Sequence, residues 1–162
     1  MSCLILLLAA VLGEQYFVDT GKASAVHKVA VISVGGGRGT VNRLESRLTV
    51  TLQANGLMVV PLAETKAYAR KHLPDSAPNS QLAASDNTVL VPEGVRQSYP
   101  EPFRKALGDA ARQLGADAVV VVSANGSSLY LAVVDRNGSY VFAIIGLATD
   151  KGISKALEHY PR

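Results

Sequence analysis

Hydrophobic residues gather in short runs in the second half of the chain, and these runs have the length and composition of β-strands. Three runs rich in β-branched residues follow one another over residues 116–147, separated by Asn125-Gly126 and Asn137-Gly138. An Asn-Gly pair between such runs is typical of a β-hairpin, because both central residues of a type I′ turn have positive φ. The pattern predicts an antiparallel meander of three strands, at Val119–Val122, Leu129–Val134 and Tyr140–Ile145.

The first half alternates between strand-like and helix-like patterns. An apolar run at 28–34 leads into Gly35-Gly36-Gly37-Arg38-Gly39, a turn sequence after which Thr40 is suited to cap a helix. Apolar residues then recur at helical spacing, with Glu45 on the polar side, until Asn55-Gly56 ends the helix. A second strand-like run follows at 57–62. This order predicts a βαβ unit with two parallel strands.

Three more helices are predicted by apolar spacing, at residues 63–73, 101–114 and 151–160. Regular pattern is lost over a proline-rich loop at 74–102, apart from a short strand-like run at 88–91. We therefore expect a single α/β domain over residues 28–162, in two or three layers. Its mixed sheet of about five strands would begin with the parallel β-α-β unit, end with the antiparallel three-strand meander and pack with about four helices.

The N-terminal residues form a separate segment. Leu4–Leu12 is uncharged and apolar, too short to span a membrane as a helix but of the length found in secretory signals. We expect residues 1–13 to be a signal peptide cut before Glu14, followed by a polar lead-in segment at 14–27. No Lys or Arg precedes the run, so the alternatives are a start codon further upstream or a buried element of the mature fold. Cys3 precedes the run instead of following it, which argues against a lipid anchor.

Composition narrows the classes of function. The net charge is +3, and the 16 basic residues are scattered along the chain, which argues against nucleic acid as a partner. Aromatic residues make up 6% of the chain and tryptophan is absent, which weakens any site that stacks bases or sugars. A mature chain without Cys3 has no thiol for a disulfide or for catalysis, and it contains no predicted transmembrane segment.

Several short motifs together resemble a known domain. They are VAVISV at 29–34, GLMVVPL at 56–62, LGAD at 114–117 and D-x-x-G at 135–138. Over about residues 28–160 the chain resembles the α/β domain shared by the TolB N-terminal region, CsgG and LpoB, which are bacterial envelope proteins. The lipoprotein cysteine common in CsgG and LpoB is absent, as is an amphipathic membrane-inserting hairpin. The resemblance implies a non-enzymatic, periplasmic or secreted domain that needs no cofactor and binds an envelope protein or itself.

The glycine turn is the main candidate for a small-molecule site. Backbone N–H groups at a helix N-terminus suit phosphate, and Gly35, Gly36, Gly37, Arg38, Gly39 and Thr40 are the candidate residues. The dinucleotide fingerprint requires a third glycine where Thr40 stands, and the P-loop requires a lysine before it. A phosphate- or nucleotide-binding α/β protein is therefore the alternative to an envelope assembly module. For the latter, the sheet edges and the loop at 74–102 are the expected contact surfaces.

Other polar residues lack the spacing of a catalytic or metal site. His27, His72 and His159 are isolated from other metal ligands, so no metal site is expected. Ser127 and Ser128 follow a turn and lack a nucleophile-elbow sequence.

Two aspartates and one helix face have a simpler structural interpretation. Asp117 and Asp135 are expected to cap strand ends rather than to form an acid–base pair, so no catalytic residue is predicted. One helix carries a basic group that would contact peptidoglycan or anionic lipid or, more simply, face solvent. Its members are Lys66, Arg70, Lys71 and His72.

Overall fold

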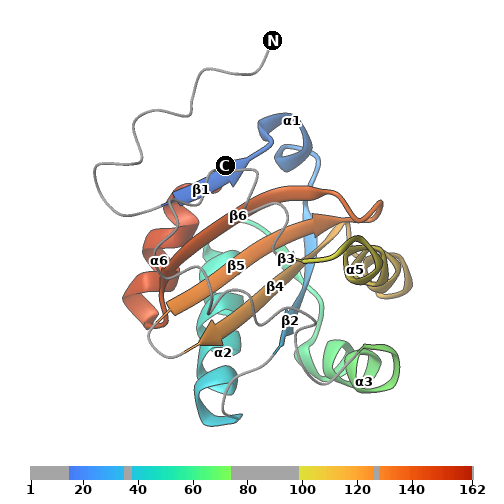
Figure 1. Ribbon diagram of the computed structural model, residues 1–162, viewed down its shortest axis with the longest axis horizontal. Coiled ribbons are helices and arrows are strands. Elements are labelled where there is room, and N and C mark those ends of the chain that lie inside the picture. Colours follow the sequence, from blue (N-terminus) through green and yellow to red (C-terminus); the bar gives the residue numbers. More distant parts are fainter. Residues whose placement is uncertain (1–14, 35–37, 74–98, 126–127, 162) are drawn as a thin grey trace.

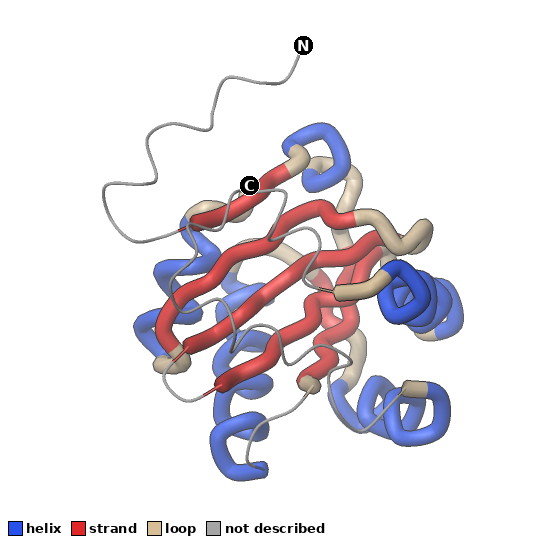
Figure 2. The backbone as a smooth tube through the Cα atoms, in the orientation of Figure 1, coloured by secondary structure: helices blue, strands red, loops and turns tan. Residues whose placement is uncertain are grey.

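The computed structural model describes residues 15–34, 38–73, 99–125 and 128–161, and the statements below concern these residues. They form a six-stranded mixed sheet with helices on both faces (Figures 1 and 2). The strands are β1 (Gln15–Val18), β2 (Lys28–Ser33), β3 (Met58–Val59), β4 (Ala118–Asn125), β5 (Ser128–Asp135) and β6 (Tyr140–Leu147). The helices are α1 (Thr20–Ala23), α2 (Arg38–Ala54), α3 (Leu62–His72), α5 (Glu101–Gln113) and α6 (Asp150–Glu158). The predicted α/β class is confirmed, in three layers.

The strand order is β1-β6-β5-β4-β2-β3. β2 runs parallel to both of its neighbours, β3 and β4, whereas β4, β5, β6 and β1 pair antiparallel in turn. The predicted βαβ unit and the predicted meander are therefore both present. β2 joins the βαβ unit to the meander, because its two neighbours in the sheet are β3 and β4. The chain reaches β3 through α2 and later reaches β4 after α3 and α5.

Side chains that alternate along the strands build two apolar cores, one on each face of the sheet. α2 and α6 cover the first face with Leu44, Leu48, Leu52, Ile153, Ala156 and Leu157. α5, with part of α3, covers the second face with Phe103, Leu107, Ala110, Ala111 and Tyr68. A register shift between β5 and β6 places Val141 and Phe142 in the same core, as a β-bulge does.

The segment predicted as a lead-in supplies a sixth strand to the sheet. β1 pairs with β6 from Gln15↔Ile145 to Val18↔Phe142, and α1 follows directly. Four residues are too few for a two-residue periodicity to stand out in a sequence, and the polar residues around them hide the strand. The domain therefore includes β1 and α1.

The β5–β6 turn differs from the predicted type I′ turn. Gly138 has a φ of 78°, but no described non-glycine residue has a positive φ, so Asn137 does not. The Gly138 N–H donates to the Asp135 carbonyl at 3.0 Å, and the Asp135 N–H donates to the Ser139 carbonyl at 2.9 Å. This is the longer hairpin loop in which a turn ends at a left-handed glycine. In the β4–β5 hairpin the ladder reaches Asn125↔Ser128, and the two turn residues lie outside the described residues.

Other boundaries shift by a few residues. α2 begins at Arg38, so Thr40 lies inside its first turn and does not cap it. Gly56 has positive φ after α2, as predicted, and Gly115 has positive φ after α5. β3 has only two residues, and the chain turns into α3 just after Pro61, which has no N–H to donate to a ladder. The predicted signal peptide, the run at 88–91 and most of the loop at 74–102 lie outside the described residues.

Candidate interaction surface

β1 forms one edge of the sheet, and alternate backbone groups of this strand point away from it. The Asp19 N–H donates to the Val141 carbonyl at 2.8 Å, and two residues earlier Phe17 pairs with Ala143. Bonded and non-bonded pairs alternate in an antiparallel ladder, so Phe17 directs its N–H and C=O toward β6. The N–H and C=O groups of Tyr16 and Val18 therefore face outward, where no described strand pairs with them.

The sequence of β1 does not protect this edge. Natural edge strands are usually blocked by charges, prolines, bulges or extreme shortness. β1 reads Gln-Tyr-Phe-Val, and its register with β6 has no shift. The opposite edge, β3, has two residues and is followed closely by Pro61. β1 is therefore the better of the two edges for the addition of another strand.

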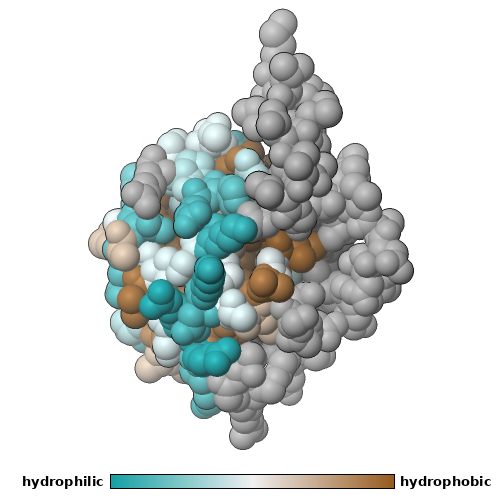
Figure 3. All heavy atoms as spheres, turned by 90° about the vertical axis from the view of Figure 1, so that its left-hand side faces the viewer, coloured by the Kyte–Doolittle hydropathy of each residue, from teal (hydrophilic) through white to brown (hydrophobic). Residues whose placement is uncertain are grey.

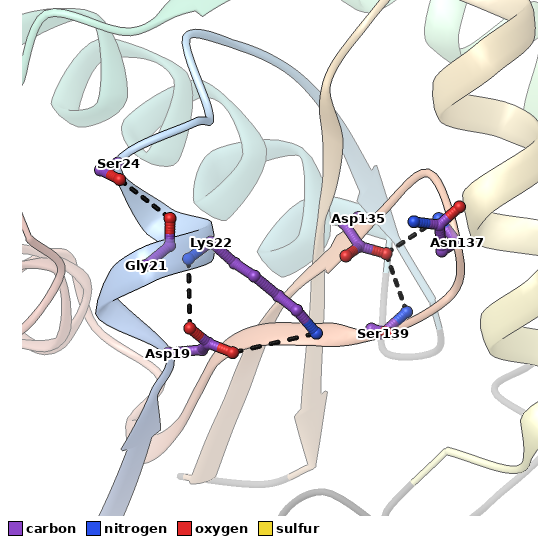
Figure 4. A network of polar contacts seen from close by, with 7 residues as sticks. All are labelled: Asp19, Gly21, Lys22, Ser24, Asp135, Asn137 and Ser139. Carbon is purple, nitrogen blue, oxygen red and sulfur yellow. Dashed lines mark hydrogen bonds and ion pairs between the residues drawn. The ribbon is translucent and has the colours of Figure 1, made fainter. Parts of the chain in front are cut away.

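Three contacts help to hold β1 in place. The Tyr16 ring stacks on His159 at the end of α6, with ring centroids 4.4 Å apart and planes 18° apart. Val18 packs against the core beneath α6. Asp19 caps α1, since its Oδ1 accepts the Lys22 N–H at 3.1 Å while the Lys22 ammonium lies 3.8 Å from Oδ2 (Figure 4). A fixed edge loses less conformational entropy on binding than a mobile one.

The surroundings of β1 include one exposed apolar residue. β1 pairs with β6 only as far as Ile145, so Gly146 and Leu147 run past its end, and Leu147 is 63% exposed. The outer side of α6, in contrast, presents a hydrophilic band (Figure 3) with exposed Asp150, Lys151, Lys155 and Glu158. Leu147 therefore adds exposed apolar surface near β1, whereas the outer side of α6 is polar.

The predicted phosphate site stays a prediction, because the structure describes only part of it. Gly35, Gly36 and Gly37 lie outside the described residues, and Arg38, Gly39 and Thr40 form the first turn of α2. At the nearby end of β2 the structure places a buried carboxylate, that of Glu45, which is 3% exposed and accepts a hydrogen bond from the Ser33 hydroxyl.

Glu45 was predicted to lie on the solvent side of its helix, and that prediction is wrong. The Lys66 ammonium of α3 forms an ion pair with Glu45, 2.9 Å from its Oε2. The same ammonium donates a hydrogen bond to Asn42 Oδ1 at 3.3 Å. The pairing with a residue on another helix allows the carboxylate to be buried. Of the predicted basic face, Arg70, Lys71 and His72 remain exposed, so its contact with peptidoglycan or lipid stays a prediction.

The two aspartates have the capping roles predicted for them. Asp135 Oδ1 accepts the N–H groups of Asn137 and Ser139 at 2.8 and 2.9 Å and so fixes the β5–β6 turn (Figure 4). Asp117 Oδ2 accepts the N–H groups of His27 and Lys28, both at 3.0 Å, and ties the start of β2 to the start of β4. Both carboxylates are engaged with backbone donors.

Asp117 gives the fold a defined pH dependence. Burial raises the pKa of Asp117. The hydrogen bonds from His27 and Lys28 lower this pKa, as does the charge of Arg136, and together they outweigh the effect of burial. The pKa therefore lies below its ordinary value of 3.8. The stability that Asp117 contributes is thus present above pH 3.8 and is lost as the pH falls through the lowered pKa. We expect Asp117→Ala to lower the free energy of unfolding at pH 7 by about 1–3 kcal/mol, because two N–H groups lose their acceptor.

Urea unfolding of the wild type and of Asp117→Ala at pH 7 and at progressively lower pH measures this effect. The difference between the two should shrink as the pH falls. Asp109→Ala is the matched control, since Asp109 is exposed and its ion pair among the described residues is with Arg112 on the same helix. It should change stability by less than about 0.5 kcal/mol. A difference for Asp117→Ala that does not vary with pH would contradict the assignment.

The three histidines lie apart from one another. His27 engages Asp117 through its backbone, the His72 ring lies 4.4 Å from that of Tyr68, and His159 stacks on Tyr16. Among the residues that the structure describes, no three His, Cys, Asp or Glu side chains are grouped as a metal site would need. Within the same residues, no helix is both long and apolar enough to cross a membrane. Ser127 lies outside the described residues, and Ser128 is the first residue of β5.

A buried tyrosine network, which the sequence did not predict, anchors the end of the loop at 74–102. Tyr99 is 1% exposed, and its N–H donates to the Tyr140 hydroxyl at 3.0 Å. Its own hydroxyl lies 3.2 Å from the Ser123 hydroxyl, and the Arg104 Nε donates to its carbonyl at 3.2 Å. The chain therefore enters α5 from a fixed point on the second face of the sheet.

No protein-family model and no curated protein sequence matches this chain. Solved structures similar to it include two of the PelC dodecamer from Paraburkholderia phytofirmans, one of them a point variant, with TM-scores of 0.45. Their sequences are 15% and 13% identical to this one. Each alignment covers 89% of this chain, and it covers 94% and 93% of the two PelC chains. Another is the lipoprotein GNA1162 from Neisseria meningitidis, with a TM-score of 0.43, 14% identity and coverage of 74% of this chain and 78% of that one.

Likeness at this level assigns neither a function nor an assembly state to this chain. None of these three structures is of TolB, CsgG or LpoB, so the resemblance found in the sequence motifs stays a prediction. The expected absence of a lipid anchor also stays a prediction, since Cys3 lies outside the described residues.

Proposed function

We propose that this chain is an exported bacterial envelope protein that works without catalysis, as an assembly module that binds a protein partner at the edge strand β1. It would act in the periplasm or after secretion. The export step rests on the signal-like apolar run at 4–12. The assembly role rests on one observation, the outward-facing backbone groups of Tyr16 and Val18 on an edge strand that carries no charge or proline.

Strand addition fits the chemistry of this edge. An incoming strand gains backbone hydrogen bonds at Tyr16 and Val18, and alternate side chains give it specificity. The contacts of Tyr16 with His159 and of Asp19 with α1 hold the edge in an extended form before binding. The aspartates first considered as an acid–base pair are engaged with backbone N–H groups, which supports a structural role for them.

Photo-cross-linking in a Gram-negative host tests the proposal. The full chain carries a photoreactive residue at Lys22, which is exposed beside β1, or at Lys105, which is exposed on α5. We expect an envelope protein adduct from position 22 and none from position 105. The same cells should contain a processed chain in the periplasm, beginning near Glu14 by intact mass.

Two proline variants make the test specific to the edge. Val18→Pro removes an outward N–H and should reduce the position-22 adduct about tenfold while the sheet stays folded, because edge strands accept proline where the N–H faces solvent. Phe17→Pro removes an N–H that bonds to β6 and should instead destabilise the fold, by about 3 kcal/mol. An adduct that Val18→Pro leaves unchanged, or no adduct at position 22, would show that β1 is not the contact.

A further inference from the structure

We infer that the partner at β1 is a second copy of this chain, paired antiparallel across a two-fold axis at Phe17. This inference rests on the proposed function, since it names the occupant of the same edge. Each copy brings a sheet of six strands with β1 outermost, so the pair would form one continuous sheet of twice six strands. Identical surfaces meet across a two-fold axis, and each contact then occurs twice.

The positions of the outward groups fix the register of this pairing. Tyr16 and Val18 direct their N–H and C=O groups outward, whereas Phe17 between them does not. With the axis at Phe17, Tyr16 of each copy exchanges hydrogen bonds with Val18 of the other. The two Phe17 residues then form the non-bonded pair, with Cα atoms about 4.5 Å apart.

Other registers use the edge less well. A shift by one residue sets outward groups against inward ones and forms no ladder. With the axis at Tyr16, Tyr16 of one copy pairs with Tyr16 of the other. Val18 then pairs with position 14 of the other copy, which precedes β1. Only the axis at Phe17 pairs both outward residues of β1 with each other.

The side chains of β1 are suited to face themselves. Tyr16 and Val18 lie on the α6 side of the sheet, so the register places an aromatic ring against a β-branched side chain, twice. Phe17 lies on the α5 side and meets the second Phe17. Aromatic–aromatic and aromatic–β-branched pairs are among the cross-strand pairs that stabilise sheets. Half-buried Phe17 and Ile145 would continue the second core across the axis.

Charge also favours a copy of the same chain over a charged peptide. A charged residue at a two-fold axis faces its own like charge, which is destabilising. Tyr16, Phe17 and Val18 are all uncharged, so the axis at Phe17 carries no such repulsion. Beyond the Val18 end of the strand, the nearest described charges are Asp19 and Lys22, which pair with each other. The strand itself offers no charge by which to select an acidic or basic partner.

Single-cysteine cross-linking tests the axis directly. In a Cys3→Ser background, Phe17→Cys places two cysteines opposite each other, whereas Tyr16→Cys places them two residues out of register. Cysteines whose Cα atoms are more than about 7 Å apart cannot be bridged, so we expect about tenfold more disulfide-linked dimer from Phe17→Cys under mild oxidation. Adding Val18→Pro should abolish this dimer. Unfolding of each reduced variant checks that its fold persists.

Sedimentation of the full wild-type chain gives a second readout that needs no new cysteine. It should show a concentration-dependent dimer that Val18→Pro converts to monomer. Equal cross-linking from both cysteines, more from Tyr16→Cys, or a monomer at all concentrations would overturn the second copy as the occupant. In that case, an in-cell adduct at position 22 that is still lost in Val18→Pro would support the proposed function with a different partner. Absence of that adduct would contradict both the proposed function and the second copy as the partner.

Discussion

Replacing Gly152 with alanine is expected to lower the free energy of unfolding by about 2–3 kcal/mol, the cost of overpacking where atoms cannot move apart. Gly152 lies in the first turn of α6, where the helix passes the end of β6. A Cβ at this position would lie 1.9 Å from the Leu147 carbonyl oxygen and 2.8 Å from its carbon. Both are backbone atoms, so no side-chain rotation relieves the clash. Alanine gains helix propensity over glycine, but only by about 1 kcal/mol.

Gly146→Ala is the matched control for this prediction. Gly146 lies in β6, one residue before Leu147, and a Cβ there would meet nothing within 4 Å. Since no described atom would clash with this Cβ, we expect a change within about 0.5 kcal/mol. Urea unfolding of both variants measures the difference. Equal stability of the two variants would contradict the close approach of α6 to β6, and with it the support that α6 gives to Tyr16 through His159.

Truncating Tyr99 to alanine is expected to cost about 3–5 kcal/mol, the range found when a buried aromatic residue is removed. The ring packs against Phe103 and Tyr130, with centroids 5.2 and 5.1 Å away. Loss of the ring leaves a cavity in the second core and takes a hydroxyl partner from Ser123. The variant should also loosen the entry into α5, because the ring that holds residue 99 in the second core is lost.

Two tyrosine-to-phenylalanine variants separate the hydroxyl from the ring. Tyr99→Phe should cost about 1 kcal/mol, since it removes one buried hydrogen bond. Tyr160→Phe should be neutral or slightly stabilising, because the buried Tyr160 hydroxyl has no hydrogen-bond partner among the described residues, and burial raises its pKa to about 12. Thermal and urea unfolding measure both. A larger loss for Tyr160→Phe than for Tyr99→Phe would contradict this assignment of the hydroxyl partners.

Long periodic segments made most of the fold predictable. The β-branched runs before and after Asn125-Gly126 gave the meander, and the spacing of Leu44, Leu48 and Leu52 gave α2. These signals are local, because a strand or helix that buries a face repeats its apolar residues at a fixed period. The same local chemistry predicted the left-handed glycine, Gly56, that ends α2.

The edge strand and the buried carboxylate could not be predicted in this way. β1 has four residues, and its pairing with β6 depends on residues more than a hundred positions away. Glu45 follows Leu44 on α2 and reads as a polar surface residue, because its counter-ion Lys66 belongs to another helix. The sequence predicted contact surfaces only in general terms, as the sheet edges and the loop at 74–102, since the strand order that makes β1 an edge is a property of the whole sheet.

Amide hydrogen exchange along β1 tests the central claim most directly, in the isolated chain at low concentration and in the assembly recovered from the envelope. In the isolated chain, the N–H groups of Tyr16 and Val18 should exchange rapidly while those of Phe17 and Asp19, which face β6, are protected. In the assembly, all four should be protected. If Tyr16 and Val18 still exchange rapidly in the assembly, the partner binds elsewhere. If they are already protected in the dilute chain, the edge is not open to a partner.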